Sequence, residues 1–512
     1  MLFVVTTGLF APLLGNGFVS YDDEAYVVSN PQVNTGLGFA NARWAATSMQ
    51  DRNWMPLTRL SYQIDCSLWG LAPRFHHLMS ALYHGIAAIA LAMVLRSMGL
   101  QPTSTFLAAA LFAVHPVQVE SVAWAAARKD VLAAIFCFLA IWRWLAWLES
   151  GSRRDYWTCF CLVAASLLCK QAAVGLPLLF LVLARRARRG PGMDVSRAAR
   201  VLWPFVALAL ATGLLTLLAQ RNPGAQQLLP RQEGMAMAHA PWSVVSYLGA
   251  VLWPAGLNYL HVLALPVPLW KPLAGFLVLL CLTWLIGRVR AKHPLVWTGW
   301  VWLLLLYLPA SGLIPFGPQA WAERFGYVAM GGISLMLGGA LEAIRASGGW
   351  SRLVLVGTSA AIVVLGVLTA RQQAFWRSSE CLFQRAIRVD PSNGYARFHL
   401  AGWLERNHRS EEAFRQYADA VRATPDFWPA RYNYACGLMG RRRHAEALEA
   451  IRPVPGAIPR WPEAHLVLAN ALYETGDARG ALRHYEEAAR LKPSLLVAKR
   501  NARTLRESGV RP

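Results

Sequence analysis

The sequence predicts an all-α protein, with a polytopic helical membrane domain over 1–370 followed by an α-solenoid over 371–512. The chain is 55% hydrophobic and only 15% charged, whereas a soluble domain carries about a quarter charged residues. After residue 370 the composition changes from apolar to charged and aromatic, and a regular repeat begins. A net charge of +22 is also found in nucleic-acid-binding proteins. Here, however, much of the basic excess lies in short loops between apolar runs, the pattern that orients membrane proteins.

Eleven apolar runs in the first 370 residues predict membrane-spanning helices. A span needs about 20 mainly apolar residues, and fewer where protein covers part of it. We interpret the first run as a retained helix, because it has no basic n-region and no convincing small-residue cleavage site. The runs are 1–18, 77–95, 103–116, 131–148, 156–170, 172–184, 200–219, 272–287, 295–310, 327–345 and 352–370.

Basic residues mark every second loop between these runs. Such loops are usually cytoplasmic, so the other loops are expected on the outer face, with the N-terminus inside and the C-terminus outside. This predicts a multi-pass protein of the inner (cytoplasmic) membrane of the cell, whose repeat region lies on the periplasmic side. The basic groups are Arg96; Arg153 and Arg154; a cluster from Arg185 to Arg200 that includes Arg188 and Arg189; Arg288 to Lys292; and Arg345 with Arg352.

A further apolar run, 243–257, lies between two stretches that this topology places outside, 220–241 and 258–271. It is therefore predicted to be re-entrant or to lie in the membrane interface. The sequence Pro254-Ala255-Gly256 favours a broken helix there, because proline interrupts helical hydrogen bonding.

A repeat of 34 residues runs through 371–512 and is marked by prolines at regular intervals. This spacing is typical of tetratricopeptide (TPR) repeats, in which two antiparallel helices pack through small residues and a proline ends the second helix. Three full repeats are predicted to begin near 394, 428 and 462, after a partial one, with 494–512 as a capping helix. The repeating positions are Pro391, Pro425, Pro459 and Pro493; Ala386, Ala420, Val454 and Ala488; Phe383, Tyr417, Ile451 and Tyr485; Ala413, Ala447 and Ala481; and Ala401, Ala435 and Ala469.

Three consecutive acidic residues, Asp22-Asp23-Glu24, follow the first apolar run in a chain with only 28 acidic residues. The predicted topology places polar groups of the other outward loops on the same membrane face. Carboxylates in one part and cations in another suit a reaction in which a base activates an acceptor hydroxyl while cations hold a departing phosphate. These other groups are His76, His77, His115, Glu120, Arg128, Lys129, Asp130, Lys170 and Arg324.

Each of these groups also has a structural interpretation. The acidic run could mark the water boundary of a helix, although acidic groups at a membrane are costly unless they are used. The Arg128-Lys129-Asp130 triplet could form an ion pair that anchors the fourth span. His76, His77 and His115 could bind a metal together with the aspartates, or make hydrogen bonds at the interface.

The order of the motifs resembles that of a known family. In chain order they are Asp22-Asp23, Asn30-Pro31, Asn53-Trp54-Met55-Pro56-Leu57-Thr58, His76-His77-Leu78, His115-Pro116 with Glu120-Ser121-Val122-Ala123-Trp124, Arg128-Lys129-Asp130, and Glu323-Arg324 with Tyr327. Followed by TPR repeats, this order is similar to that of bacterial relatives of the transmembrane-and-TPR protein O-mannosyltransferases, which belong to the GT-C glycosyltransferase class. The chain departs from the family pattern at Gln171 and Phe325.

The resemblance implies an enzyme that moves a sugar, mannose by the family's name, from a polyprenyl-phosphate donor to the hydroxyl of a protein Ser or Thr on the outer face. It places the catalytic base on Asp22 or Asp23, with a slight preference for Asp23, and leaves a divalent metal open. The TPR groove would guide the acceptor. The residues expected to bind donor phosphate or substrate are Arg128, Lys170, Arg324, His115, Glu120 and His77.

Two alternatives remain open at this point. The same base and phosphate site would serve transfer to a lipid-linked or cell-envelope glycan. A membrane-anchored TPR scaffold without enzymatic activity is the other alternative, but an anchor needs only one span and no clustered carboxylates.

Overall fold

The computed structural model describes residues 1–50, 53–186, 195–220, 233–263, 266–313, 319–348 and 352–511. Among the described residues, the regular secondary structure is helical except for one short antiparallel pair of strands, β1 (His261–Val262) and β2 (Gln319–Trp321). The predicted all-α class is therefore confirmed. The chain divides into two compact units, the first ending at Leu382 and the second running from Phe383 to Pro512.

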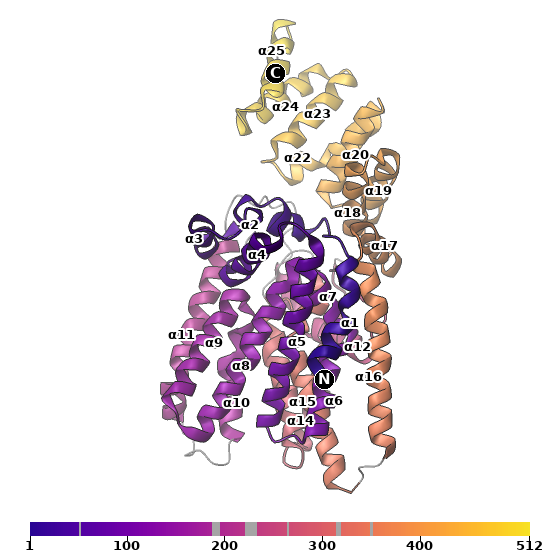
Figure 1. Cartoon of the computed structure of the whole chain (residues 1–512). Coiled ribbons are helices and arrows are strands. Elements are labelled where there is room, and N and C mark those ends of the chain that lie inside the picture. Colours follow the sequence, from indigo (N-terminus) through magenta and orange to yellow (C-terminus); the bar gives the residue numbers. More distant parts are fainter. Residues whose placement is uncertain are drawn as a thin grey trace. The chain divides into compact units, whose positions relative to one another are not determined.

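Each predicted apolar run coincides with a helix or a pair of helical segments of the first unit (Figure 1). Run 1–18 is helical only in part, as α1 (Leu2–Leu9) and a 3-10 turn at Ala11–Gly15, and run 172–184 divides into a 3-10 turn at Gln171–Gly175 and α10. The helices are α5 (Pro73–Ser97), α6 (Pro102–Val114), α8 (Arg128–Ser150), α9 (Arg153–Cys169), α10 (Leu176–Arg186), α11 (Val195–Gln220), α12 (Glu233–Leu252), α13 (Trp270–Arg288), α14 (Pro294–Tyr307), α15 (Met330–Ala346) and α16 (Arg352–Gln373).

Five described helical segments are long and apolar enough to cross a membrane: Pro73–Ser97, Ala125–Ser150, Ala199–Ala219, Trp270–Arg288 and Arg352–Trp376. A bent pair, Pro102–Val114 with Pro116–Ala123, would make a sixth, and three shorter apolar helices accompany them. These helices support a multi-pass membrane protein. The count of eleven spans and the orientation stay predictions.

The segment predicted to be re-entrant belongs to a longer helix than expected. Helix α12 begins at Glu233 rather than near residue 243, with Pro241 inside it, and ends at Leu252, just before Pro254. Its predicted path in a membrane stays a prediction. Residues 221–232 of the predicted outward loop, and Arg188 and Arg189 of the basic cluster, lie outside the described residues.

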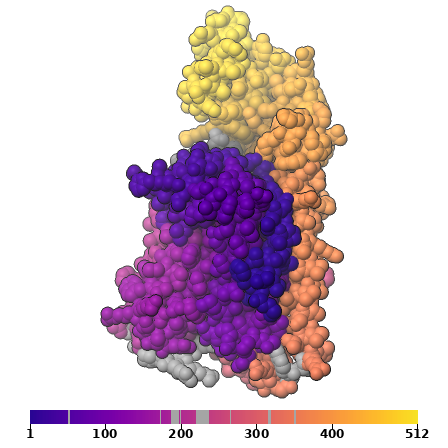
Figure 2. Space-filling view, in the orientation of Figure 1, coloured from indigo at the N-terminus to yellow at the C-terminus, as the bar shows by residue number. Residues whose placement is uncertain are grey.

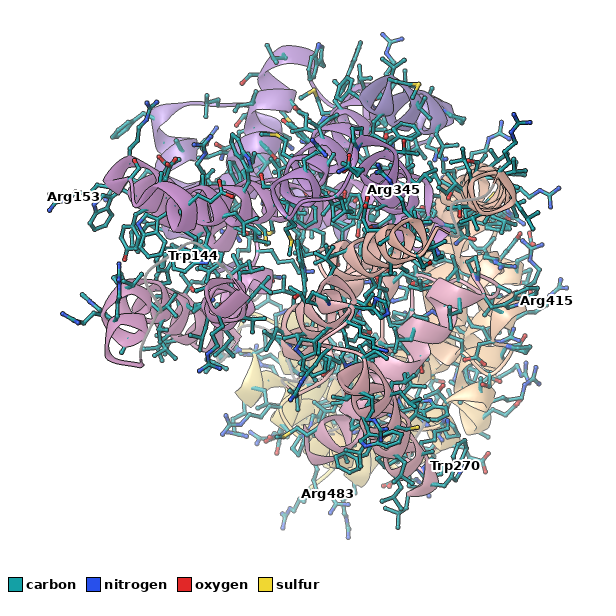
Figure 3. The ribbon with its side chains drawn as sticks, turned by 90° about the horizontal axis from the view of Figure 1, so that it is seen from below. Trp144, Arg153, Trp270, Arg345, Arg415 and Arg483 are labelled. Carbon is teal, nitrogen blue, oxygen red and sulfur yellow. The ribbon has the colours of Figure 1, made fainter. Side chains whose placement is uncertain are left out.

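Aromatic side chains fill the spaces between the helices of the first unit. The ring of Trp144 on α8 stacks on Phe180 of α10 at 4.6 Å and meets Phe205 of α11 edge-on at 5.9 Å. Figure 3 shows Trp144 among these helices, whereas Arg153 at the start of α9 points away from them. Apolar packing of this kind fixes the helices against one another.

The long first loop covers the end of the unit where α5 and α8 begin (Figures 1 and 2). It contains a π-helical turn at Glu24–Val28 and three short helices, α2 (Pro31–Asn34), α3 (Phe39–Thr47) and α4 (Pro56–Trp69). The Asn30-Pro31 motif has a structural role here. The Asn30 side chain accepts a hydrogen bond from the Gln32 amide at 3.2 Å and caps α2, and proline suits the first helical position.

The second unit consists of helices that pack in sequence order. After α17 (Ser379–Val389), these are α18 (Gly394–Arg406), α19 (Ser410–Ala423), α20 (Trp428–Gly440), α21 (His444–Ile451), α22 (Pro453–Ala457), α23 (Pro462–Glu474), α24 (Ala478–Leu491) and α25 (Leu496–Glu507). All the alanines of the predicted 34-residue pattern are buried. Pro391, Pro425, Pro459 and Pro493 each follow the end of a helix. These observations agree with helix pairs, and the TPR assignment and the domain bounds stay predictions.

Candidate functional site

The two neighbouring aspartates of the first loop have different surroundings. Asp23 is fully buried, and its two carboxylate oxygens accept hydrogen bonds from the backbone amides of Val19 at 2.9 Å and Ala126 at 2.8 Å. Burial raises the pKa of Asp23 to about 7, against the lowering effect of these two hydrogen bonds. Asp23 therefore ties the first loop to the segment that precedes α8.

Asp22 is half-buried. Burial raises its pKa, and the positive charges of Lys129 and Arg324 act in the opposite direction. A carboxylate that faces two cations and keeps partial access to solvent is better placed to meet a substrate than one enclosed by backbone amides. The burial and contacts of Asp22 and Asp23 therefore distinguish two residues that the sequence could not distinguish.

Lys129 lies beside Asp22 at the start of α8. Its ammonium group is 3.5 Å from the Tyr26 hydroxyl, which also accepts a hydrogen bond from the Asn53 side chain at 3.0 Å, and it lies 4.8 Å from the centre of the Tyr26 ring. In the described part of the chain, Lys129 makes no ion pair with a carboxylate at contact distance. Lys129 is therefore the cation of this region whose charge is least neutralised by direct contact.

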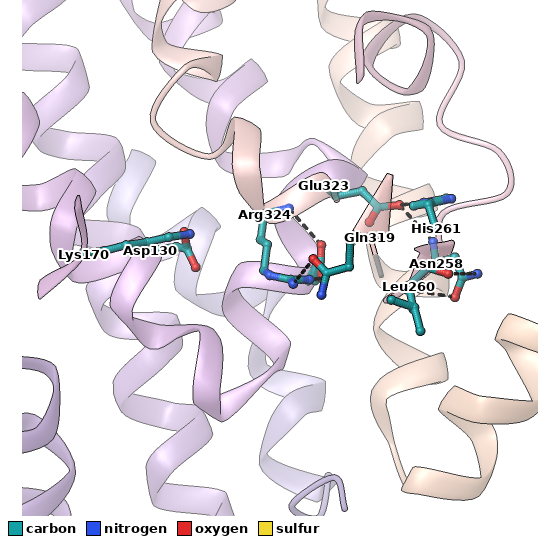
Figure 4. A network of polar contacts seen from close by, with 9 residues as sticks. Asp130, Lys170, Asn258, Leu260, His261, Gln319, Glu323 and Arg324 are labelled. Carbon is teal, nitrogen blue, oxygen red and sulfur yellow. Dashed lines mark hydrogen bonds and ion pairs between the residues drawn. The ribbon is translucent and has the colours of Figure 1, made fainter. Parts of the chain in front are cut away.

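Lys170 and Arg324 each pair with a carboxylate from a different segment (Figure 4). The Lys170 ammonium group contacts Asp130. The Arg324 guanidinium contacts Glu120, and the Arg324 amide donates to the other oxygen of Glu120 at 2.8 Å. These contacts bring the segments around Glu120, Asp130, Lys170 and Arg324 together.

The other terminal nitrogen of the Arg324 guanidinium contacts the short β hairpin. This nitrogen, Nη2, donates to the side-chain oxygen of Gln319 on β2 at 2.7 Å. On the partner strand, His261 lies 2.9 Å from Glu323, and its ring stacks on Trp321 at 3.9 Å. The Asn258 amide donates to the same Glu323 oxygen at 2.9 Å. Burial raises the pKa of Glu323, but His261 and this amide outweigh it, so the net shift is downward.

The side chain of Arg128 is surrounded by protein and is not accessible to solvent. It is fully buried, lies 2.5 Å from Asp65 of α4, and donates to the His76 carbonyl at 2.8 Å. The rings of Tyr62 and Tyr83 flank it, with centres 4.9 Å and 5.7 Å away. Neighbouring residues on a helix point about 100° apart, which is why Arg128 faces the interior while Lys129 faces Asp22. This geometry favours the structural interpretation, an anchoring ion pair, with Asp65 rather than Asp130 as the partner.

The two predicted histidines make backbone contacts. His115 caps the turn after α6 through the Val117 amide at 3.3 Å and lies 2.9 Å from the Val251 carbonyl at the end of α12. His77 lies 3.3 Å from the Gly17 carbonyl. Both are buried, and both join segments far apart in the sequence.

Among the described residues, no three His, Cys, Asp or Glu side chains gather as a metal site would require. His77, His115, Asp22 and Asp23 do not form such a group, so no described residue set is assigned to a metal.

Reasoning from the sequence placed Lys129 among the cations of the site but not among the residues expected to bind phosphate, and it did not select Asp65 or His261. Lys129 stands in the Arg-Lys-Asp triplet, but only the rotation of α8 decides which basic residue faces the aspartates. Asp65 and Arg128 meet across 63 positions, and His261 and Glu323 across 62. A single sequence carries no signal for such pairs.

An apolar helical unit with buried carboxylates and cations at one end is the architecture of a multi-pass membrane protein with a polar site where its helices end. No protein-family model matches the chain.

The chain is similar to proteins named protein O-mannosyl-transferases. It is 25% identical to mouse TMTC3 over 89% of this chain and 55% of that protein, and 25% identical to mouse TMTC4 over 80% of this chain and 64% of that protein. A shorter stretch is 35% identical to Drosophila melanogaster Tmtc2, covering 32% of this chain and 19% of that protein. The chain spans about half the length of most of the curated relatives that it matches.

Proposed function

We propose that the chain is a membrane glycosyltransferase of the GT-C class that moves mannose from a polyprenyl-phosphate donor to the hydroxyl of a protein Ser or Thr. The observation that carries the proposal is the position of Asp22 beside Lys129 and Arg324 at one end of an apolar helical unit. The similarity to proteins named protein O-mannosyl-transferases supports the sugar and the acceptor class.

In the proposed reaction, Asp22 takes the proton of the acceptor hydroxyl. The hydroxyl oxygen attacks the anomeric carbon of the sugar, and the bond between that carbon and the phosphate oxygen breaks on the opposite side. The configuration at the anomeric carbon is therefore inverted. The polyprenyl phosphate leaves with one more negative charge on its oxygens, and nearby cations stabilise that charge.

Lys129, Lys170 and Arg324 are the cations proposed to bind the leaving phosphate. Lys170 and Arg324 already contact carboxylates, whereas Lys129 is held by a tyrosine hydroxyl and ring. A phosphate would therefore gain most from Lys129, because charge-assisted hydrogen bonds are strong where the donor is not yet neutralised. Arg128, predicted for this role, is enclosed by Asp65 and is proposed to anchor the fold instead.

Asp23 is proposed as a positioning residue. Its two carboxylate oxygens hold the amides of Val19 and Ala126, and so fix the backbone on which Asp22 stands. Glu120 is proposed to orient Arg324 through two contacts. The acceptor protein is proposed to be guided by the predicted TPR groove, on the outer face of the inner membrane of a bacterial cell.

The test uses the purified full chain, radiolabelled polyprenyl-phosphate mannose and a Ser/Thr-rich peptide. Asp22→Asn is expected to lower transfer by about 100-fold or more, as loss of a general base does. Glu24→Gln, two positions away in the same acidic run, is the matched control and is expected to retain transfer. Full activity of Asp22→Asn at equal protein abundance would remove the catalytic assignment.

The acceptor is tested in the same assay. Transfer to a lipid-linked glycan but not to the peptide would establish the alternative acceptor class. If no polyprenyl-phosphate sugar from a panel is transferred or hydrolysed, the scaffold alternative is favoured over an enzyme.

A further inference from the structure

The segment that follows α16 contacts the loop that carries Asp22. We propose that this segment, Trp376 to Ser379, is a positioning element for Asp22. The chain at the entry to the second unit would thereby set the geometry of the acidic loop. The catalytic part of this inference rests on the proposed function, whereas the contacts themselves do not.

Two hydrogen bonds join the segment to the first loop. The Gly17 amide donates to the Arg377 carbonyl at 3.2 Å, and the Ser20 amide donates to the Ser379 hydroxyl at 2.8 Å. Ser379 is only 4% exposed, so this hydroxyl is largely shielded from water. Ser20 is half-buried, so its amide would be left partly shielded from water and without a partner if this acceptor were lost, which is unfavourable.

An aromatic stack provides a second attachment. Trp376 stacks on Trp124 with the ring centres 5.9 Å apart, and Trp124 in turn lies 5.6 Å from the ring of Tyr21, the residue before Asp22. Trp124 also lies under the guanidinium of Arg324 at 5.1 Å. Both tryptophans are 2% exposed. The stack therefore reaches the residue that precedes the proposed base and one of the proposed phosphate-binding cations.

The hydrogen bonds and the aromatic stack of this segment act on the same stretch of the first loop as the hydrogen bonds that Asp23 accepts. The amide of Val19 donates locally, to Asp23 four residues on, whereas the amide of Ser20 donates to Ser379, which is 359 positions away. Consecutive peptide groups just before Asp22 are therefore fixed by one local and one long-range hydrogen bond. Catalytic groups work only when held within about 0.5 Å of the productive geometry. Without Ser379 and Trp376, Asp22 keeps its chemistry but loses part of its orientation.

Ser379 is also the first residue of α17. The same helix includes Phe383 and Ala386, which are fully buried, and from Phe383 onward the chain belongs to the second unit. The residue that holds the Ser20 amide thus belongs to the helix on which the second unit begins.

The test compares Ser379→Ala and Trp376→Ala with conservative variants, Ser379→Thr and Trp376→Phe, in the full chain. Ser378→Ala is the matched control, because the Ser378 hydroxyl caps the Cys381 amide of α17 at 3.3 Å and does not bond to the first loop. Mannose transfer gives kcat and the donor KM. Hydrogen exchange of the Ser20 amide gives the positioning directly, independent of any activity.

We expect Ser379→Ala and Trp376→Ala to lower kcat by about 10-fold with the donor KM unchanged, because small misplacements of a catalytic group cost rate rather than binding. Ser379→Ala should speed exchange at Ser20, and the Thr and Phe variants should restore wild-type behaviour. Unchanged exchange at Ser20, or equal losses of kcat in Ser378→Ala and Ser379→Ala, would overturn the inference. Asp22→Asn remains the separate test of the proposed function.

Discussion

Replacing Arg128 by Met tests whether this arginine anchors the fold or binds phosphate. The substitution would leave Asp65 buried without the guanidinium that lies 2.5 Å away, while keeping a long apolar side chain between Tyr62 and Tyr83. Burial already raises the pKa of Asp65, and the charge of Arg128 opposes that shift. Removing one partner of a buried ion pair costs about 3–5 kcal/mol, so we expect a marked loss of stability.

The next residue offers a matched comparison. Lys129 makes no contact-distance ion pair with a carboxylate within the described ranges, so Lys129→Met should change stability by no more than about 1 kcal/mol. It should instead lower kcat/KM for the donor about 10- to 100-fold, the range of one lost charge-assisted hydrogen bond. The double variant Arg128→Met with Asp65→Leu should recover stability, because neither buried charge remains.

Thermal unfolding of each purified variant in detergent and mannose transfer at a permissive temperature separate these effects. The reasoning requires Arg128→Met to lower the melting temperature and the double variant to restore it. If Arg128→Met keeps the wild-type melting temperature and loses only transfer, the arginine binds phosphate, as its place in the sequence motif suggested. The anchoring role is then wrong.

Three further predictions concern the acidic loop, the β hairpin and the repeats. The pKa of Asp23 is about 7 in the folded state and near 3.8 in the unfolded chain. The folded state therefore binds the proton more tightly, and the melting temperature should fall as pH rises from about 4 to about 7. Asp23→Asn should flatten that dependence. His261→Ala should leave Glu323 without its ring partner and destabilise the chain by about 1–3 kcal/mol, which thermal unfolding measures against wild type. Ala420→Leu should overpack a fully buried site at a cost of about 1–3 kcal/mol and speed proteolysis of the second unit, whereas the exposed Arg422→Leu should not.

The helices of the first unit could be predicted because long apolar runs bounded by charged loops carry their own signal. The gathering of polar groups from several loops could also be predicted, because alternating basic loops place all the other loops on one face; which membrane face that is stays a prediction. The start of α12 was not predicted, because the predicted apolar run begins only at residue 243, two positions after Pro241. In the structure it lies within the helix, where Gly275 of α13 packs closely enough that a Cβ on it would lie 2.6 Å from the Trp242 amide. Packing, rather than local preference, decides such a position.

The different surroundings of adjacent residues in the site could not be predicted in the same way. Asp22 and Asp23 are adjacent in sequence, and only the amides of Val19 and Ala126 distinguish them. Arg128 and Lys129 are likewise adjacent, and only the direction in which α8 faces Asp65 separates them. The charged neighbours in the sequence do not distinguish the two aspartates, so the slight preference for Asp23 as base had no support from them, whereas the contacts favour Asp22.

Because of the π-helical turn after the aspartates, the number of residues in this loop determines the positions of its side chains as much as their identity does. Its carbonyls at Ala25 and Val28 accept hydrogen bonds from the side chains of Asn30 at 3.4 Å and Asn34 at 2.9 Å, so the turn is held at its far end while Asp23 holds the near end. Deleting the exposed Ala25 would rotate the residues on one side of the turn relative to those on the other. Tyr26 would then leave Lys129, although no functional group had been removed. Insertions and deletions should therefore be tolerated far less here than in α3 or in the turns between the repeats.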